Sequence, residues 1–175
     1  MAVALALVMA GCGSSSPQKV SASSYVKSVC GTATTWYRSI QTAGGKLQST
    51  VHKSTSLSAA KGAYVSFVDS LLSATQRAEQ QLKNAGTPAV KGGKAISDEV
   101  VHAFHGARVG LARASAQVRK APTTSSTAFE TSAAGVQGTV QRALQSMASL
   151  APQKNSQLRA AALKDPTCQQ LRAVG

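Results

Sequence analysis

Acidic, aromatic and bulky aliphatic side chains are all scarce in this sequence. Only 6 of its 175 residues are Asp or Glu, and it has one Trp, three Tyr and three Phe. So few carboxylates argue against most general acid–base sites and against sites for hard metal ions, which need oxygen ligands. Leu, Ile, Val and Phe make up about 19% of the residues, a low share that with high net charge is typical of disordered chains. Only the helical periodicity of the apolar residues indicates that this chain folds.

The motifs of several common active sites are also absent. The sequence has no G-x-S-x-G nucleophile elbow, no G-x-x-x-x-G-K-[S/T] phosphate loop and no G-x-G-x-x-G dinucleotide fingerprint. It has no C-x-x-C, so a thioredoxin-like redox role lacks its motif. We therefore expect no enzymatic activity, no catalytic residues and no cofactor.

An apolar run, MAVALALVMA, occupies residues 1–10 and is followed by Gly11-Cys12. A helix of this length covers only about half of a ~30 Å hydrocarbon core, but it suits the h-region of a signal peptide. The segment Val8-Met9-Ala10-Gly11-Cys12 resembles the lipobox of bacterial lipoproteins. That resemblance implies a signal peptide over residues 1–11 and an acylated Cys12. Because no Lys or Arg precedes the run, we expect the true start codon to lie upstream of Met1.

The remaining sequence divides into a tether and a domain. Residues 12–24 are rich in Ser, Gly and Pro and are expected to form a flexible tether, with a helical domain over residues 25–175. If Cys12 is acylated, Cys30 and Cys168 remain as a pair, which an exported protein is free to oxidise. We expect a structural disulfide, worth roughly 4–5 kcal/mol in the chain-entropy model. A reactive or metal-binding pair is the alternative.

Four stretches carry apolar residues at alternating spacings of three and four, the pattern of one helix face. They run from Val26 to Leu47, from Leu57 to Ala85, from Val100 to Val118 and from Phe129 to Leu150. A short helix is expected near residues 157–163. The fold class that follows is all-α, an up-down four-helix bundle with a short C-terminal helix, closed by one disulfide. In that topology Cys30 and Cys168 meet at one end of the bundle.

Capping signals indicate where these helices begin and weaken. Thr87 and Pro88 fit the N-cap and first turn of the third helix. Thr127 and Glu130 resemble a capping box that opens the fourth. The glycine pair at residues 44–45 is expected to weaken the end of the first helix, because each Gly costs roughly 1 kcal/mol relative to Ala.

One cluster of metal-binding residue types stands out. Glu99, His102 and His105 form E-x-x-H-x-x-H, and Glu-x-x-His occurs in di-iron bundle proteins. Those sites need two such motifs, and this chain has one. If Val100 and Phe104 face the core, the three residues lie on the outer side. We expect solvated side chains, with a surface Zn²⁺ or Cu²⁺ site as the weaker alternative.

A net charge of +13 is the strongest indication of a partner. Nucleic acid is not expected, because the protein is predicted to be exported and its longest basic run is Arg119-Lys120. Anionic lipid headgroups or anionic wall polymers would suit a basic domain tethered to a membrane. A role in solubility alone is equally compatible with the charge.

The overall pattern is that of a small Ala/Ser/Thr-rich chain with a Cys near each end of a helical domain. It resembles uncharacterised lipoproteins of high-GC Gram-positive bacteria, a resemblance of style that carries no site residues. We expect a lipid-anchored protein on the extracytoplasmic face of the cell membrane, acting as a non-catalytic interaction or scaffold module. A helical bundle that senses or carries a small molecule or a metal is the alternative.

Overall fold

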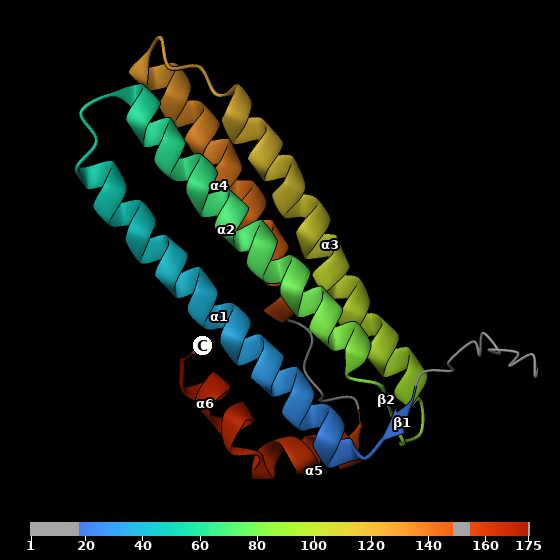
Figure 1. The fold of residues 1–175 in the computed structure, drawn as a ribbon. Helices are drawn as coiled ribbons and strands as arrows, with labels where there is room; N and C mark the ends of the chain where they lie inside the picture. Colours follow the sequence, from blue (N-terminus) through green and yellow to red (C-terminus); the bar gives the residue numbers. More distant parts are fainter. Residues whose placement is uncertain (1–17, 149–154, 175) are drawn as a thin grey trace, which may run out of the picture.

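Four long helices of alternating direction form the body of the domain (Figure 1). The computed structural model describes residues 18–148 and 155–174, and helices α1 to α6 account for most of them. The predicted all-α class is confirmed. The helices are α1 (Ala22–His52), α2 (Leu57–Asn84), α3 (Gly93–Lys120), α4 (Ser126–Ala148), α5 (Ser156–Lys164) and α6 (Pro166–Val174).

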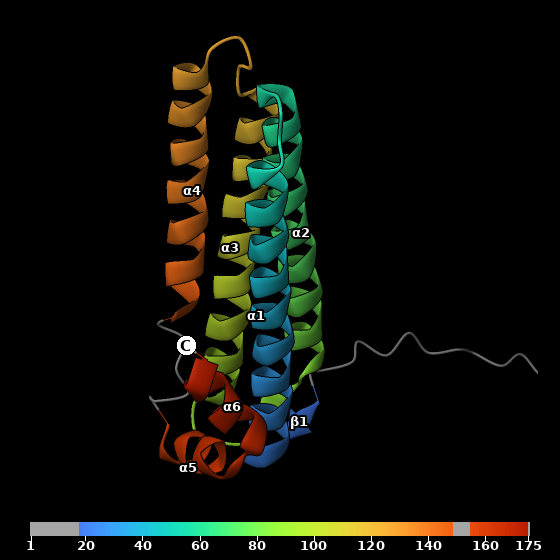
Figure 2. The same ribbon diagram turned by 90° about the vertical axis from the view of Figure 1, so that its left-hand side faces the viewer.

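The long helices pack in chain order. α1 packs on α2, α2 on α3, and α3 on α4, while α5 and α6 pack on α1 near its beginning. In Figure 2, α4 stands at the left edge of the domain, apart from α1 near the centre. Among the described residues, α1 and α4 are not a closely packed pair, which differs from a fully closed bundle. No helix within the described ranges is both long and apolar enough to cross a bilayer.

Small side chains dominate the core, as the composition requires. Alanine is its most frequent residue, and Ala107 and Ala114 of α3 are completely buried. The large side chains are concentrated at a few contacts. Trp36 of α1 packs edge-on against Phe104 of α3, and its indole N–H donates to Thr75 Oγ1 of α2 at 2.9 Å. Trp36 is therefore a partly buried residue that packs against the core and contacts two other helices.

Residues 18–21, which precede the first helix, pair with a distant part of the chain, although we expected a tether as far as Ser24. Strand β1 (Lys19–Val20) pairs in parallel with β2 (Thr87–Pro88). The Thr87 N–H donates to the carbonyl oxygen of Gln18 at 2.9 Å, and the Ala89 N–H donates to that of Val20 at 2.8 Å. Ser21 then caps α1 by accepting from the Ser24 N–H.

This pairing also overturns the predicted start of the third helix. Thr87 and Pro88 form β2 rather than an N-cap and first turn, and α3 begins at Gly93. The backbone N–H of Thr87 is used by the distant residue Gln18, so a tertiary contact overrides the local capping preference. Helix α3 ends at Lys120, two residues before Pro122, which has no backbone N–H and cannot continue a helix.

One further local prediction is wrong. The N-cap of α4 is Ser125 and not Thr127, because Ser125 Oγ accepts from the Ala128 N–H at 3.4 Å. Helix α1 continues without a break through the glycines at 44–45 to His52. Burial of Ala43 against the main core supplies packing energy that offsets the low helix propensity of glycine there.

Candidate functional site: the end of the domain where α1 begins

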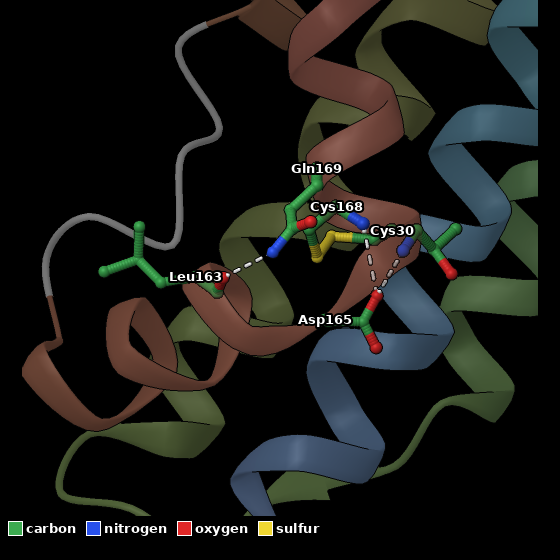
Figure 3. The surroundings of a disulfide bond; sticks show 6 residues. Cys30, Leu163, Asp165, Cys168 and Gln169 are labelled. Carbon is green, nitrogen blue, oxygen red and sulfur yellow. Dashed lines mark hydrogen bonds between the residues drawn. A yellow bond between two sulfur atoms is a disulfide. The ribbon is translucent and has the colours of Figure 1, made fainter.

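The predicted disulfide lies at this end of the domain. Cys30 of α1 and Cys168 of α6 are bonded, with their Cα atoms 5.1 Å apart and 138 residues apart in sequence (Figure 3). Both side chains are buried in a small apolar cluster, which also contains Tyr25 and Leu158. The bond therefore fixes the C-terminal helices against the beginning of α1. Cys12, the predicted acylation site, and the predicted signal peptide over residues 1–11 lie outside the described residues.

Local sequence signals place Cys168 where the bond requires it. Asp165 accepts hydrogen bonds from the backbone N–H groups of Thr167 and Cys168, at 2.9 and 3.1 Å, and so acts as the N-cap of α6. Pro166 follows at the first helical position, where its missing N–H costs nothing. The Asp165-Pro166 pair therefore separates α5 from α6 and begins the second of these helices.

Helix α5 lies across this end of the domain (Figures 1 and 2). Asn155 caps α5 by accepting from the N–H groups of Gln157 and Leu158. Its side-chain amide also donates to the carbonyl oxygen of Lys91, at 3.2 Å, in the connection between α2 and α3. One residue thus fixes both the start of α5 and its position beside the α2–α3 connection.

Two glycines allow close approach between backbone segments at this end of the domain. Gly86 has φ +80°, and a Cβ atom at this position would lie 2.6 Å from the carbonyl oxygen of Gln18. A Cβ atom at Gly93 would lie 1.9 Å from the carbonyl oxygen of Pro88. Neither position accepts a larger residue without a backbone shift. The strand pairing and the start of α3 both depend on them.

Seven basic residues lie on β1, the beginning of α1, the end of α2, the α2–α3 connection, the beginning of α3 and α5, a surface that we call the basic end. Asp98 neutralises one of them, since it accepts from Lys94 at 2.6 Å. Within the described ranges, five of the seven form no ion pair, and all seven are exposed. The set is Lys19, Lys27, Lys83, Lys91, Lys94, Arg159 and Lys164. Clustered cations of this kind raise the local electrostatic potential, which attracts anions in general.

The structure does not gather the E-x-x-H-x-x-H residues into a metal site. Glu99, His102 and His105 are all exposed, as we predicted. No group of three potential metal ligands comes together within residues 18–148 and 155–174. His105 instead lies against Glu79 of α2, with its Nδ1 3.2 Å from Glu79 Oε1. A carboxylate only accepts hydrogen bonds, so His105 donates in this contact.

Glu79 is the one buried acidic side chain among the described residues, and sequence analysis did not identify it. Its Oε1 also accepts from Lys83 and its Oε2 accepts from Arg108 Nε, both at 2.7 Å. Burial alone would raise the pKa of the Glu79 carboxyl. The hydrogen bonds from Lys83, Arg108 and His105 outweigh it and lower this pKa from 4.5 to about 2. The cluster joins α2 to α3 as a structural ion network.

We expect Glu79→Gln to lower the free energy of unfolding at neutral pH by about 2 kcal/mol, because hydrogen bonds to a charged group are lost. The folded pKa lies below the unfolded one, so this stabilisation is present above about pH 4.5 and disappears as pH falls toward 2. Urea unfolding at pH 7 and pH 3 measures both effects. If the free energies of unfolding of Glu79→Gln and wild type differed by the same amount at both pH values, this account would be contradicted.

A groove lies between α1 and α2, near the end of the domain opposite the basic end. It has a volume of about 440 Å³, and its lining includes Lys46, Leu47, Ala63 and Phe67. The lining is mostly small and apolar, with one cation at Lys46. Sequence analysis missed this groove, because it arises where small residues of two helices face each other.

Leu163 is the other functional candidate that sequence analysis missed. It is 54% exposed and is the one large hydrophobic side chain with such exposure in the described part of the chain. In Figure 3 it points away from the disulfide and from the helices behind it. Its carbonyl oxygen accepts from the Gln169 side chain at 2.9 Å, a hydrogen bond that links the end of α5 to α6.

Comparison of the sequence and fold with known protein families, curated proteins and solved structures finds no match to this chain.

Proposed function

We propose that this chain is a lipid-anchored protein of the bacterial cell envelope, attached through Cys12 to the outer face of the cytoplasmic membrane. The observation that carries the proposal is the Cys30–Cys168 disulfide. Such a bond persists in an oxidising compartment outside the cytoplasm. It also uses two of the three cysteines, so the remaining thiol is the one directly after the apolar leader.

The helical domain then serves as a non-catalytic interaction or scaffold module. Its basic residues outnumber its acidic ones by 19 to 6, and the buried polar groups Glu79 and Thr75 join helices to one another. Anionic lipid or an anionic wall polymer is the partner class that matches the charge, and nucleic acid is not available outside the membrane. Binding would be screened by salt.

Replacing Cys12 tests the anchor in cells. We expect the wild-type protein to sediment with membranes and the Cys12→Ser variant to appear in the soluble or secreted fraction. The Cys30→Ser/Cys168→Ser variant is the matched control, because it loses cysteines but keeps Cys12 and should stay with the membranes. Wild-type protein in the soluble fraction, or Cys12→Ser that stays with the membranes, would contradict a lipid anchor.

A ligand-carrying domain is the second candidate, and the groove between α1 and α2 favours it. Its volume of about 440 Å³ is within the range of small-molecule sites, and Lys46 would attract an anionic ligand. Native mass spectrometry of protein from its own host separates the two functions. Extra mass that is lost on denaturation supports a carrier, and its absence supports the interaction module.

A further inference from the structure

We propose that the basic end docks directly on anionic lipid headgroups, with Leu163 inserted among them, so that the domain stands on the membrane. This inference rests on the proposed function, because the lipid anchor brings this end to the bilayer. It adds the surface that makes the contact and the orientation of the domain. The long helices would then point away from the membrane.

The length of chain between Cys12 and the ordered domain brings this end close to the lipid. Even when fully extended, the peptide units from Cys12 to Gln18 span at most about 20 Å. The pairing of β1 with β2 fixes Gln18 at the end of the domain where α5 and the α2–α3 connection lie. The opposite end is farther away by the length of α3, whose 28 residues span about 42 Å.

Charge and position together favour this surface over the rest of the molecule. Lys91, Arg159 and Lys164 are exposed on the α2–α3 connection and on α5, the elements that lie across the end (Figure 1). Attraction to an anionic surface falls off within a Debye length of about 8 Å at physiological salt. Cations at the opposite end therefore contribute little in this orientation, although they add to the net charge.

Leu163 supplies an exposed apolar side chain on α5, the helix that carries Arg159 and Lys164. It lies between Arg159 and Lys164 on α5 and leaves 54% of its surface exposed. A single exposed leucine is common on soluble proteins. Here it is flanked by cations, at the end of the domain that the chain holds near the bilayer. Apolar side chains beside basic ones are the pattern of segments that bind at a membrane interface.

The test compares two charge-reversal variants of equal net charge. One carries Lys91→Glu, Arg159→Glu and Lys164→Glu at the basic end. The matched control carries Lys46→Glu, Lys53→Glu and Lys120→Glu, at exposed cations toward the opposite end. Each is made in the oxidised mature chain with Cys12→Ser, so that no acyl chain contributes to binding. Thermal melts by circular dichroism show that each variant is folded.

Binding is measured by sedimentation with vesicles of phosphatidylcholine, with and without phosphatidylglycerol. Each basic residue at an anionic surface contributes about fivefold, so we expect the basic-end variant to bind anionic vesicles about a hundredfold more weakly than wild type. The control variant should stay within about threefold. Leu163→Ser should weaken binding about fivefold. Equal losses in the two triple variants, or no loss in either, would overturn the proposal.

A lipid-free polyanion separates lipid from wall polymer as the partner. Inorganic polyphosphate should bind wild type and Leu163→Ser equally, because it offers no apolar layer. If polyphosphate binds wild type as tightly as anionic vesicles do, and Leu163→Ser binds vesicles normally, the surface recognises polyanions and the lipid proposal is overturned. The vesicle assay does not involve the acyl group. A negative result in this assay therefore does not contradict the Cys12 anchor. A negative result in the anchor test likewise does not contradict binding of the basic end to vesicles.

Discussion

Removal of the disulfide should lower the Tm by about 10–20 °C, the largest effect expected of any change to this protein. The Cys30→Ser/Cys168→Ser variant is the direct form of the experiment, since it leaves no unpaired thiol in the domain. The bond closes a loop over a sequence separation of 138 residues. In the chain-entropy model, a loop of that size corresponds to about 4–5 kcal/mol. The core is rich in alanine and buries little area per residue, so this contribution is a large share of the total stability.

The stability lost on removal of the disulfide should also differ between the helices. In the described part of the chain, α5 and α6 pack mainly on α1, whereas α2, α3 and α4 pack on one another. Without the bond, we expect faster amide hydrogen exchange in α5, α6 and the first turns of α1, with smaller changes in α2 and α3. The Cys12→Ser variant is the control and should match wild type in Tm. An unchanged Tm after removal of Cys30 and Cys168 would contradict the structural role of the bond.

Gly93→Ala should have the second largest effect, a loss of at least about 3 kcal/mol in the free energy of unfolding. The added Cβ atom would lie 1.9 Å from the carbonyl oxygen of Pro88, and neither group is a flexible side chain that can move aside. Relief requires a shift of α3 away from β2. That shift would weaken the pairing of β2 with β1.

Gly106→Ala is the matched control on the same helix. Gly106 is exposed in the interior of α3, and nothing lies within 4 Å of a Cβ atom built there. Because alanine is a better helix former, this change should stabilise the protein by up to about 1 kcal/mol. Urea unfolding of Gly93→Ala, Gly106→Ala and wild type gives the free energies of unfolding to be compared. Loss of stability in both, or in neither, would show that the tight contact at Gly93 does not determine the start of α3.

The spacing of apolar residues was enough to predict the helices and their class. The second helix was expected to begin at Leu57 and does, and the short helix expected near residues 157–163 is α5. The cysteine pair was identified by elimination, because acylation of Cys12 would leave only Cys30 and Cys168. These features depend on local periodicity and on residue counts, both of which a sequence displays directly.

The errors arise where a distant residue decides the local structure. Thr87 has the residue type of an N-cap, but its N–H is taken by Gln18, which lies far away in sequence. Similarly, Glu79 is a single acidic residue beside the apolar stripe of α2. Only the approach of α3 places Arg108 and His105 next to it. No periodicity within one helix reports such a contact.

The sequence predicts a strongly basic protein but not which of its cations share one surface. The sequence gives a net charge of +13 without saying which cations lie together. The disulfide and the Asn155–Lys91 hydrogen bond bring α5 across the end of the domain, and only then do Arg159 and Lys164 lie at the same end as Lys91. Leu163 was not part of any predicted stripe, so its exposure also appears only in the folded structure.

The intact mass of the detergent-extracted protein from its own host tests the central claim most directly. We predict a denatured mass that begins at Cys12, includes the acyl chains of a lipoprotein, and is lower by two hydrogens for the Cys30–Cys168 bond. A single spectrum thus reports the cleavage site, the anchor and the disulfide. A mass that begins at another residue and carries no lipid would contradict the account and make this a secreted protein without a membrane anchor.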